Sequence, residues 1–377
     1  MKIMIIAGEA SGDLHASYLI KSLLKEKGDV EIRFFGGDLM EAAAGHAPDL
    51  HYRELNVMGF VEVARHLPAI MRNLKLAKDI LRRWRPDLLI LVDFPGFNLR
   101  LAKYAHKIGV RCEYYISPKI WAWKEWRIRT IRKCISRIYS ILPFEPDFYK
   151  ARGYKDDIYV GNPSVQEIEH IMNHISPLRH FKERQGITDD RPIIALLPGS
   201  RRSEIKANLP LMIAAARRYP EFQYVVAAAS AIPEVYYREV AQDPGLKVVF
   251  GGAMTLVKYS QAALVTSGTA TLETALVGTP QVVCYRANGK RWTYNIMEKL
   301  LHVKYVSLPN LIVGNRVVPE LLLHNCTTEN IARELSPLLQ SSPKREWQIN
   351  GYKMMRRKLG TSVAADYAAE LIMESDK

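Results

Sequence analysis

The chain has 377 residues, of which 48% are hydrophobic and 24% are charged, and its net charge at pH 7 is +14. This composition is typical of a soluble globular protein and excludes a disordered chain, and the length predicts two large domains. The four cysteines lie far apart without a Cys-x-x-Cys pair, which argues against a zinc knuckle, a redox pair and a disulfide framework.

The sequence shows no recognisable signal for export or membrane insertion. The apolar run of residues 3–7 is too short for the core of a signal peptide. An uninterrupted apolar stretch of about 18 residues, as a transmembrane helix needs, does not occur. We therefore expect a cytoplasmic protein.

Short apolar runs alternate with amphipathic stretches in the first half of the chain. This alternation predicts βαβ units on a parallel sheet. The expected strands are residues 2–7, 30–35, 87–92, 110–116, 137–141 and 156–160. The expected helices are residues 13–27, 67–84, 97–108, 124–134 and 144–152.

The alternation stops over residues 161–190, where Gly161, Pro163 and Pro177 lie, and we place an interdomain linker there. The pattern then repeats. The expected strands are residues 192–197, 222–228, 246–250, 262–266 and 280–284, and the expected helices are residues 203–218, 233–241, 254–260, 270–277 and 290–301. From about residue 317 onward the sequence predicts helices and no further strand.

These elements predict an α/β protein with two Rossmann-like parallel-sheet domains that face a central cleft, followed by a helical C-terminus. We expect residues 1–165 to form an N-terminal domain and residues 166–345 a C-terminal domain. Helices in residues 346–377 are expected to pack back on an N-terminal domain. Two-Rossmann glycosyltransferases, sugar-nucleotide epimerases and periplasmic binding proteins share this architecture, so the fold alone does not settle the function.

Two motifs follow expected strands of the first half. Residues 8–13 (GEASGD) form a turn whose glycines let backbone amides approach a ligand, or a simple turn in which Asp13 caps the next helix. Asp93 ends a buried strand and precedes a Pro-Gly elbow, which makes it a candidate general base for a substrate hydroxyl. The alternative is that Asp93 caps the helix that begins near residue 97.

Two motifs of the second half suit a phosphorylated ligand. Residues 197–204 (LPGSRRSE) combine a tight turn at Gly199 with Arg201, whose planar guanidinium fits phosphate oxygens. In residues 267–273 (SGTATLE), small hydroxyl residues open a helix whose N-terminus suits a diphosphate, and Glu273 could bind ribose hydroxyls. The alternatives are an ordinary loop with exposed arginines and a well-capped helix.

His170 and His174 have metal-ligand spacing, but no third ligand is evident, so no metal site is predicted.

Positive charge is concentrated in residues 65–137, which contain 18 Lys or Arg, five acidic residues and four of the six tryptophans. Within this window, residues 67–84 combine an apolar stripe with basic side chains, and such a helix either covers a sheet or lies on an anionic bilayer. The partner of the window is a phospholipid surface, a phosphorylated substrate or nucleic acid. Nucleic acid is the weakest choice, because no zinc-finger, RNP or GXXG signature accompanies the charge.

Nine segments over about 300 residues carry a family resemblance. They are residues 8–13 (GEASGD), 57–63 (VMGFVEV), 93–98 (DFPGFN), 117–123 (SPKIWAW), 142–145 (LPFE), 197–201 (LPGSR), 267–273 (SGTATLE), 285–286 (YR) and 307–310 (SLPN). In this order and combination the chain resembles the lipid A disaccharide synthases, a family of GT-B glycosyltransferases. Two positions depart from the family pattern, since Asn162 stands where histidine is usual and Lys119-Ile120 where Ser-Val is frequent.

The resemblance implies a reaction and a set of site residues. A 2,3-diacylglucosamine unit would pass from UDP-2,3-diacylglucosamine to the 6-hydroxyl of 2,3-diacylglucosamine 1-phosphate (lipid X), giving the β-1,6 lipid A disaccharide 1-phosphate and UDP. The family inverts at the anomeric carbon and uses no cofactor and no bound metal. Asp93 would be the catalytic base. The implied donor-binding residues are Gly199, Ser200, Arg201, Ser267, Gly268, Thr269, Ala270, Thr271, Glu273, Tyr285, Arg286 and Asn310, and the implied acceptor-binding residues are Gly8, Glu9, Ser11, Gly12, Asp13, Met58 and Gly59.

Both implied substrates carry acyl chains. The resemblance therefore implies a cytoplasmic enzyme that is peripheral on the inner face of the inner membrane of a Gram-negative bacterium, with an anionic membrane surface and no nucleic acid as partner. The residues expected at the membrane are Arg72, Lys75, Arg82, Arg83 and Trp84. A homodimer is compatible with these expectations. The alternative functions are a non-hydrolysing UDP-sugar epimerase and a lipid-binding or nucleic-acid-binding protein without catalytic activity.

Overall fold

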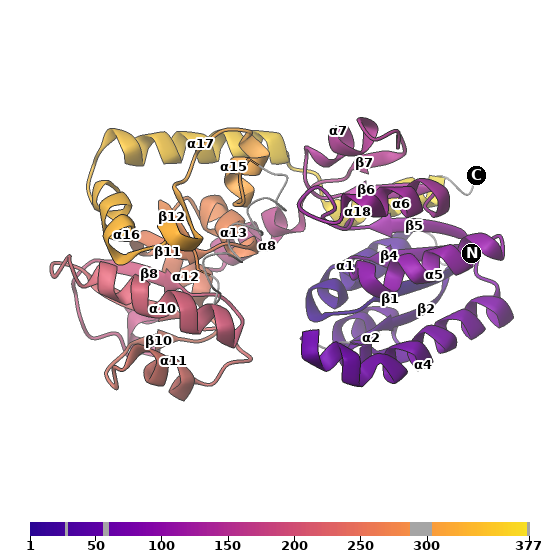
Figure 1. Cartoon of the computed structure of the whole chain (residues 1–377), viewed down its shortest axis with the longest axis horizontal. Coiled ribbons are helices and arrows are strands. Elements are labelled where there is room, and N and C mark those ends of the chain that lie inside the picture. The colour runs from indigo at the N-terminus through magenta and orange to yellow at the C-terminus, as the bar shows by residue number, and fades with distance from the viewer. Residues whose placement is uncertain (27–28, 56–59, 287–303, 375–377) are drawn as a thin grey trace. The chain divides into compact units, whose positions relative to one another are not determined.

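The computed structural model describes residues 1–26, 29–55, 60–286 and 304–374, with the backbone alone described over residues 60–67. The chain divides into two compact units, which Figure 1 shows. The first unit comprises Met1–Pro163 and Thr361–Lys377, and the second unit comprises Ser164–Gly360. Each unit contains one parallel sheet covered by helices, so the predicted α/β class with two Rossmann-like domains is confirmed.

In the described part of the first unit, seven parallel strands form the sheet in the order β3-β2-β1-β4-β5-β6-β7. They are β1 (Lys2–Ala7), β2 (Glu31–Gly36), β3 (Leu50–His51), β4 (Leu88–Val92), β5 (Arg111–Tyr115), β6 (Arg137–Ser140) and β7 (Asp157–Tyr159). Strand β4 is buried throughout, which explains its uninterrupted apolar sequence. The strand order reverses between β1 and β4, so the loops after these two strands lie where such folds bind ligands.

Helices cover both faces of the first sheet (Figure 1). They are α1 (Ala10–Glu26), α2 (Asp38–Ala44), α3 (Tyr52–Leu55), α4 (Phe60–Trp84), α5 (Pro95–Lys107), η1 (Glu125–Arg127), α6 (Ile128–Cys134), α7 (Glu145–Lys150) and α18 (Ala364–Glu374). Helices α4, α5 and α6 pack on one face, and α1 and α18 pack on the other. Leu74, Ala77 and Leu81 of α4 lie in the core, so this stripe covers the sheet as one of the two interpretations of residues 67–84 predicts.

In the described part of the second unit, six parallel strands form the sheet in the order β10-β9-β8-β11-β12-β13. They are β8 (Ile193–Leu197), β9 (Gln223–Ala227), β10 (Val248–Val249), β11 (Ser260–Thr266), β12 (Gln281–Tyr285) and β13 (Glu320–Leu322). Here the order reverses between β8 and β11, which places the loops after these strands at the ligand-binding edge. The helices are α8 (Pro163–Asn173), α9 (Leu178–Arg184), α10 (Arg202–Ala216), α11 (Glu234–Ala241), α12 (Ala253–Lys258), α13 (Thr269–Val277), α15 (Leu308–Val313), η2 (Leu323–Asn325), α16 (Thr328–Leu335), η3 (Ser336–Leu338) and α17 (Pro343–Leu359).

The structure differs from the sequence-based expectation in several segments. Strand β13 lies in the part of the chain where no further strand is expected, and its three residues are too few to produce a periodic pattern. The expected linker of residues 161–190 contains α8 and α9. The units meet in sequence after Pro163, two residues before the expected boundary. The helix expected at residues 290–301 lies outside the described residues.

The C-terminal helices also divide differently from the expectation that residues 346–377 pack back on an N-terminal domain. Helix α18 packs in the first unit, where Ser22 Oγ on α1 donates a hydrogen bond to Asp366 Oδ1 on α18 (2.6 Å). Helix α17 belongs to the second unit instead. The Gln348 side chain of α17 exchanges hydrogen bonds with the backbone N–H and C=O of Gln281 (2.9 and 3.0 Å), which ties α17 to the first residue of β12.

Candidate active site

Two predicted motifs meet at the carboxyl edge of the first sheet, one after β1 and one after β4. A Cβ atom on Gly8 would lie 2.2 Å from Cδ1 of Phe94, so only glycine lets these loops approach so closely. Gly12 lies against Ala7 at the start of the next helix. The structure therefore brings residues 8–13 and 93–98 together within one unit.

Asp93 has a strained but well-supported backbone. Its φ angle of 40° and that of Phe94, 46°, both lie in the left-handed region, which costs a non-glycine residue about 1–3 kcal/mol. The Asp93 carbonyl accepts hydrogen bonds from Asn98 Nδ2 (2.7 Å) and the Tyr114 hydroxyl, and its N–H donates to the Ile116 carbonyl (3.2 Å). Helix α5 begins at Pro95 without a cap from any described side chain, so the helix-capping alternative for Asp93 is wrong.

The Asp93 carboxyl group is suited to proton transfer near neutral pH. Burial, followed by the charge of Glu9, raises the pKa of Asp93 to about 6, against the opposing effect of Lys119. A carboxyl group with such a pKa is ionised at neutral pH and is still basic enough to accept a proton from a hydroxyl in a transition state. Within the same loop, the Ser11 hydroxyl donates to Glu9 Oε1 (3.5 Å).

Asp13 has a structural partner that neither interpretation of residues 8–13 predicts. Its buried carboxylate accepts hydrogen bonds from the N–H groups of Gly37 (2.6 Å), Leu39 (3.2 Å) and Met40 (3.2 Å). These are the residues at the start of α2, so Asp13 satisfies that helix N-terminus rather than the N-terminus of its own helix. A role of Asp13 in acceptor binding stays a prediction, and Met58 and Gly59 lie outside the described residues.

A buried carboxylate that the sequence analysis did not assign joins two of the family segments. Glu145 is 1% exposed and accepts hydrogen bonds from Ser117 Oγ (3.1 Å), Trp121 Nε1 (3.0 Å) and the Leu142 N–H (3.1 Å). Burial raises the pKa of Glu145 to about 7. The signal for it was present, because residues 117–123 and 142–145 both contribute to the resemblance and only the second contains an acid.

The loop after β8 in the second unit is built around Glu204. Gly199 has a φ angle of 108°, and a Cβ atom there would lie 2.5 Å from Glu204 Oε2. This carboxylate accepts from the N–H groups of Ser200 (3.1 Å) and Arg201 (3.3 Å), and it pairs with the Arg201 guanidinium (3.0 Å). The Arg201 side chain remains 69% exposed, so a planar cationic group is fixed at the carboxyl edge of the sheet.

Helix α13 begins at the same edge, after β11. Gly268 precedes the helix and no described side chain caps it, so the well-capped alternative for residues 267–273 is wrong. A Cβ atom on Gly268 would meet no described atom within 4 Å, and Ser267 and Thr269 are at least partly exposed. The Thr271 hydroxyl is directed to the Gly268 carbonyl (2.8 Å). The N–H groups of this turn can therefore face an anionic ligand.

Three other residues that we predict to bind the sugar donor, Glu273, Arg286 and Tyr285, lie in different environments. Burial, followed by the charge of Glu167, raises the pKa of Glu273 to about 7. Arg286 donates from its backbone N–H to Asn208 Oδ1 (2.9 Å) and from its guanidinium to the Cys326 carbonyl (3.3 Å). Tyr285 ends β12 and is partly exposed.

Asn310 does not fit its predicted role as a direct donor ligand. It is fully buried, its Nδ2 donates to the Val318 carbonyl (2.9 Å) and Glu320 Oε1 (2.8 Å), and its Oδ1 accepts from the N–H groups of Val317 and Val318. These four bonds use both N–H donors and both oxygen lone pairs of the amide. Asn310 therefore fixes the segment that leads into β13.

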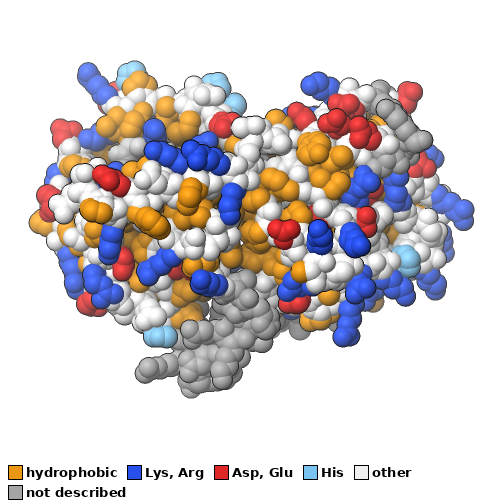
Figure 2. Space-filling view, turned by 90° about the horizontal axis from the view of Figure 1, so that it is seen from above, with side chains coloured by type: hydrophobic (Ala, Val, Ile, Leu, Met, Phe, Trp, Pro, Cys, Tyr) orange, Lys and Arg blue, Asp and Glu red, His pale blue; other side chains and the backbone are white. Residues whose placement is uncertain are grey.

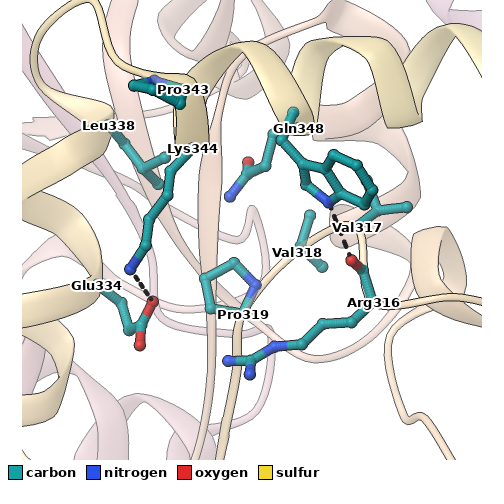
Figure 3. Close-up of a pocket in the computed structure, with 10 residues that line it drawn as sticks. Arg316, Val317, Val318, Pro319, Glu334, Leu338, Pro343, Lys344 and Gln348 are labelled. Atoms are coloured by element: carbon teal, nitrogen blue, oxygen red, sulfur yellow. Dashed lines mark hydrogen bonds and ion pairs between the residues drawn. The ribbon is translucent and has the colours of Figure 1, made fainter.

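A pocket of about 380 Å³ in the second unit lies elsewhere (Figure 3). It is lined by Arg316, Val317, Val318, Pro319, Glu334, Leu338, Pro343, Lys344, Trp347 and Gln348. Pro319 immediately precedes β13, and Gln348 binds the first residue of β12, so the pocket adjoins the amino ends of these strands. It is separate from the loops at the carboxyl edge, and we do not assign it to the active site.

Most exposed cations of the basic window lie on α4, α5 and α6, the helices that cover one face of the first sheet. Arg72, Lys75, Arg82 and Arg83 of α4 are exposed, as the membrane interpretation requires. Figure 2 looks on the molecule from the side turned away from α4, and Lys and Arg side chains are also frequent there. Within the described residues, no helix combines the length and apolar composition needed to cross a bilayer, and no group of three or more His, Cys, Asp or Glu is arranged as metal ligands.

The predicted membrane contact of Trp84 does not fit its surroundings. Its indole N–H donates to Glu31 Oε1 (3.2 Å), and the ring lies beneath the cationic groups of Lys2 and Arg33. The exposed tryptophans of the window are Trp123 and Trp126, with 50% and 63% of their surface accessible. The prediction that Trp84 is exposed to the membrane is wrong, because Trp84 continues the apolar stripe of α4 and packs against the core.

Two Rossmann-like parallel-sheet units, one with a carboxylate and the other with an arginine and a helix N-terminus at the ligand-binding edge, define a protein with the GT-B fold. Solved structures with this fold include UDP-GlcNAc 2-epimerase from Neisseria meningitidis bound to UDP-GlcNAc, with a TM-score of 0.70, 14% identity and coverage of 99% of this chain and 100% of that one. The glycotransferase of kitacinnamycin is similar with a TM-score of 0.60, 12% identity and coverage of 99% and 98%. At these identities the likeness shows the fold alone.

Sequence comparison gives the family. Residues 3–372 match the family model of lipid-A-disaccharide synthetase. The lipid-A-disaccharide synthase of Myxococcus xanthus is 42% identical, over 99% of this chain and 97% of that protein, and that of Geobacter metallireducens is 34% identical over the same shares. The chain belongs to the lipid-A-disaccharide synthetase family, which confirms the resemblance, and it is a glycosyltransferase of lipid A biosynthesis.

Proposed function

We propose that the enzyme transfers 2,3-diacylglucosamine from UDP to the 6-hydroxyl of 2,3-diacylglucosamine 1-phosphate (lipid X), with inversion at the anomeric carbon. The products are the β-1,6 lipid A disaccharide 1-phosphate and UDP. The observation that carries the proposal is the Asp93 carboxyl group, whose pKa is raised to about 6 at the ligand-binding edge of the first sheet in a chain of this family.

In this reaction Asp93 acts as the general base. It takes the proton of the 6-hydroxyl while that oxygen attacks the anomeric carbon and the bond from this carbon to the diphosphate breaks. The fixed backbone of Asp93 supports this role, because a base must be held at hydrogen-bonding distance from the proton that it removes. Glu9, Ser11, Gly8 and Gly12 from the neighbouring loop would contact the acceptor.

The leaving diphosphate needs positive charge, which the second unit can supply. The exposed Arg201 guanidinium and the uncapped start of α13, including Ser267, Gly268 and Thr269, would bind the phosphate oxygens. Glu273 would accept hydrogen bonds from the ribose, and Tyr285 and Arg286 would contact the donor. In this mechanism protein groups provide the stabilisation, and neither a cofactor nor a bound metal takes part.

We also propose that the enzyme binds the inner face of the inner membrane, where acylated substrates are found. The exposed cations Arg72, Lys75, Arg82 and Arg83 support attraction to anionic lipids. The exposed rings of Trp123 and Trp126 suit the interface between headgroups and acyl chains. Dimerisation stays a prediction.

The test is release of UDP from UDP-2,3-diacylglucosamine on anionic mixed micelles, with and without 2,3-diacylglucosamine 1-phosphate, followed by mass spectrometry of the lipid. We expect UDP release that depends on the acceptor, together with a tetraacylated disaccharide phosphate. Release without acceptor, or conversion of the donor sugar to an epimer, would contradict the proposal and favour an epimerase or a hydrolase.

A further inference from the structure

The loop that follows β5 is hydrogen-bonded to the backbone of Asp93. The Asp93 N–H donates to the Ile116 carbonyl (3.2 Å), and the Ile116 N–H donates to the Tyr139 carbonyl (3.0 Å) on the next strand. Ile116 has a φ angle of 61°, so the chain turns sharply at this point. The residues that follow, 117–121, therefore begin beside the proposed base.

One buried carboxylate fixes both ends of the 117–121 segment. A single oxygen of Glu145, Oε1, accepts from Ser117 Oγ and from Trp121 Nε1, while Oε2 accepts from the Leu142 N–H. Between these ends, the Tyr149 hydroxyl donates to the Pro118 carbonyl (3.2 Å). These bonds leave the segment little freedom, because breaking any of them would leave a buried polar group without its partner.

Lys119 is the exposed residue at the centre of this fixed segment. Its charge acts on two carboxyl groups and opposes the increase in the pKa of both Asp93 and Glu145. The other ionisable groups that face Asp93 are Glu9 from the loop after β1, which raises its pKa, and Tyr114 from β5, whose hydroxyl donates to the Asp93 carbonyl. Among the described residues, Lys119 is thus the cation whose charge opposes the effect of Glu9 on Asp93.

We propose that Lys119 and Glu145 are positioning residues of the transfer reaction: Glu145 fixes the 117–121 segment next to the backbone of Asp93, and this segment holds the Lys119 ammonium where its charge acts on the Asp93 carboxyl group. The inference rests on the proposed function, in which Asp93 is the base. Without the cation, Asp93 would bind a proton at higher pH, so a smaller fraction of the enzyme near pH 6 could accept a proton from the acceptor hydroxyl.

The first test is the pH dependence of kcat/KM in Lys119→Met, which removes the charge and keeps most of the side-chain length. We expect the acidic limb of the profile to move to higher pH, with activity roughly two- to fivefold lower at pH 6 and within about twofold at pH 8.5. Lys155→Met, an exposed lysine of the same unit, is the matched control and should leave the profile unchanged. A Lys119→Met profile that superimposes on that of the unmodified enzyme would overturn the proposal.

Glu145→Gln separates positioning from a merely structural role. The amide oxygen can still accept from Ser117 and Trp121, but the amide nitrogen would face the Leu142 N–H, so the segment loses one of its anchors. We expect kcat to fall with the KM for the donor unchanged and the acidic limb to shift in the same direction as in Lys119→Met. The double variant should shift no further than Lys119→Met alone, because Glu145 acts through Lys119. Equal losses at every pH, with additive effects in the double variant, would show a structural role only.

A measurement that does not require turnover keeps this inference separate from the proposed function. Carbon-13 NMR of side-chain carboxyls in aspartate-labelled protein follows the titration of Asp93, whose signal is identified by its absence in Asp93→Asn. We expect the Asp93 titration to move to higher pH in Lys119→Met and to stay in place in Lys155→Met. An unmodified enzyme without disaccharide product would refute the proposed function, whereas an unmoved titration would refute the role of Lys119.

Discussion

At the carboxyl edge of its sheet the first unit carries acidic side chains, Glu9 and Asp93, whereas the second unit carries the Arg201 guanidinium and the uncapped start of α13 at the equivalent edge. Both edges arise in the same way, from a reversal of strand order and a glycine-containing loop. One architecture therefore carries two kinds of side chain at its ligand-binding edge, and in our proposal the first unit transfers the proton and the second unit binds the diphosphate.

The largest expected effect is that of Asp93→Asn on turnover. The amide keeps the size of the side chain but cannot take a proton, so kcat should fall by about 10²- to 10⁴-fold. In the unmodified enzyme kcat/KM should rise with pH through about 6, since the ionised carboxylate is the active form, and this limb should be lost in the variant. Asp156→Asn, an exposed residue of the same unit, is the control. Turnover within a few-fold of the unmodified enzyme would remove Asp93 as the base.

The next largest expected effect is on the binding of UDP by the second unit. Arg201→Met removes the charged hydrogen bonds that we propose for the diphosphate. We expect inhibition by UDP to weaken roughly 10- to 100-fold, because hydrogen bonds to a charged group contribute about 1.5–3 kcal/mol to the free energy of binding. The acidic limb of the pH profile should stay in place, because Arg201 is not among the groups that act on Asp93. A shifted limb with unchanged inhibition by UDP would contradict the division between the units.

A smaller effect tests the outer surface of the first unit. Paired Arg72→Glu and Arg82→Glu changes should lower affinity for anionic vesicles by at least about 30-fold, since each cation near the membrane contributes about 1 kcal/mol. The matched control is Lys353→Glu with Arg357→Glu on α17 of the second unit, where both side chains are exposed. Equal loss in both pairs would show that net charge alone matters, and retention in the first pair would move the membrane surface elsewhere.

The smallest expected effect is on stability and follows from acids that the first unit buries. Burial, followed by the charge of Glu145, raises the pKa of Asp157 from 3.8 to about 8. The folded state therefore holds this proton more tightly than the unfolded chain, and the stability contributed below pH 4 is lost as the pH rises toward 8. In Asp157→Asn the melting temperature should fall less between pH 6 and pH 9 than in the unmodified enzyme. The difference should be roughly 2–4 °C for each kcal/mol of unfolding free energy that no longer depends on pH. Asp156→Asn should not change the fall in melting temperature.

The sequence predicted the strands that carry the site because β1, β4, β8 and β11 are apolar and mostly or wholly buried, a pattern that is clear at five to seven residues. It missed β3 and β13, whose two and three residues are too few to show an alternating pattern. Tertiary contacts decide whether so short a segment pairs as a strand.

The site residues were predictable to the extent that their chemistry is local. Asp93 and Arg201 stand at strand ends and could be recognised from the motif alone. The partners of Asp13 could not, because they lie at the start of α2, more than twenty residues further along the chain. The partners of Asn310 are residues 317–320, which lie close in sequence but in a segment without a regular pattern. Glu145 was missed for the same reason as the partners of Asp13, since Ser117 and Trp121 lie more than twenty residues before it.

The division of chemistry between the units is tested most directly by calorimetric titration of UDP into the unmodified enzyme, Asp93→Asn and Arg201→Met under one set of conditions. Our account predicts that Asp93→Asn binds UDP with the affinity of the unmodified enzyme, within about twofold, although it no longer turns over. It predicts that Arg201→Met binds UDP roughly 10- to 100-fold more weakly. Loss of UDP binding in Asp93→Asn, or full affinity in Arg201→Met, would contradict it.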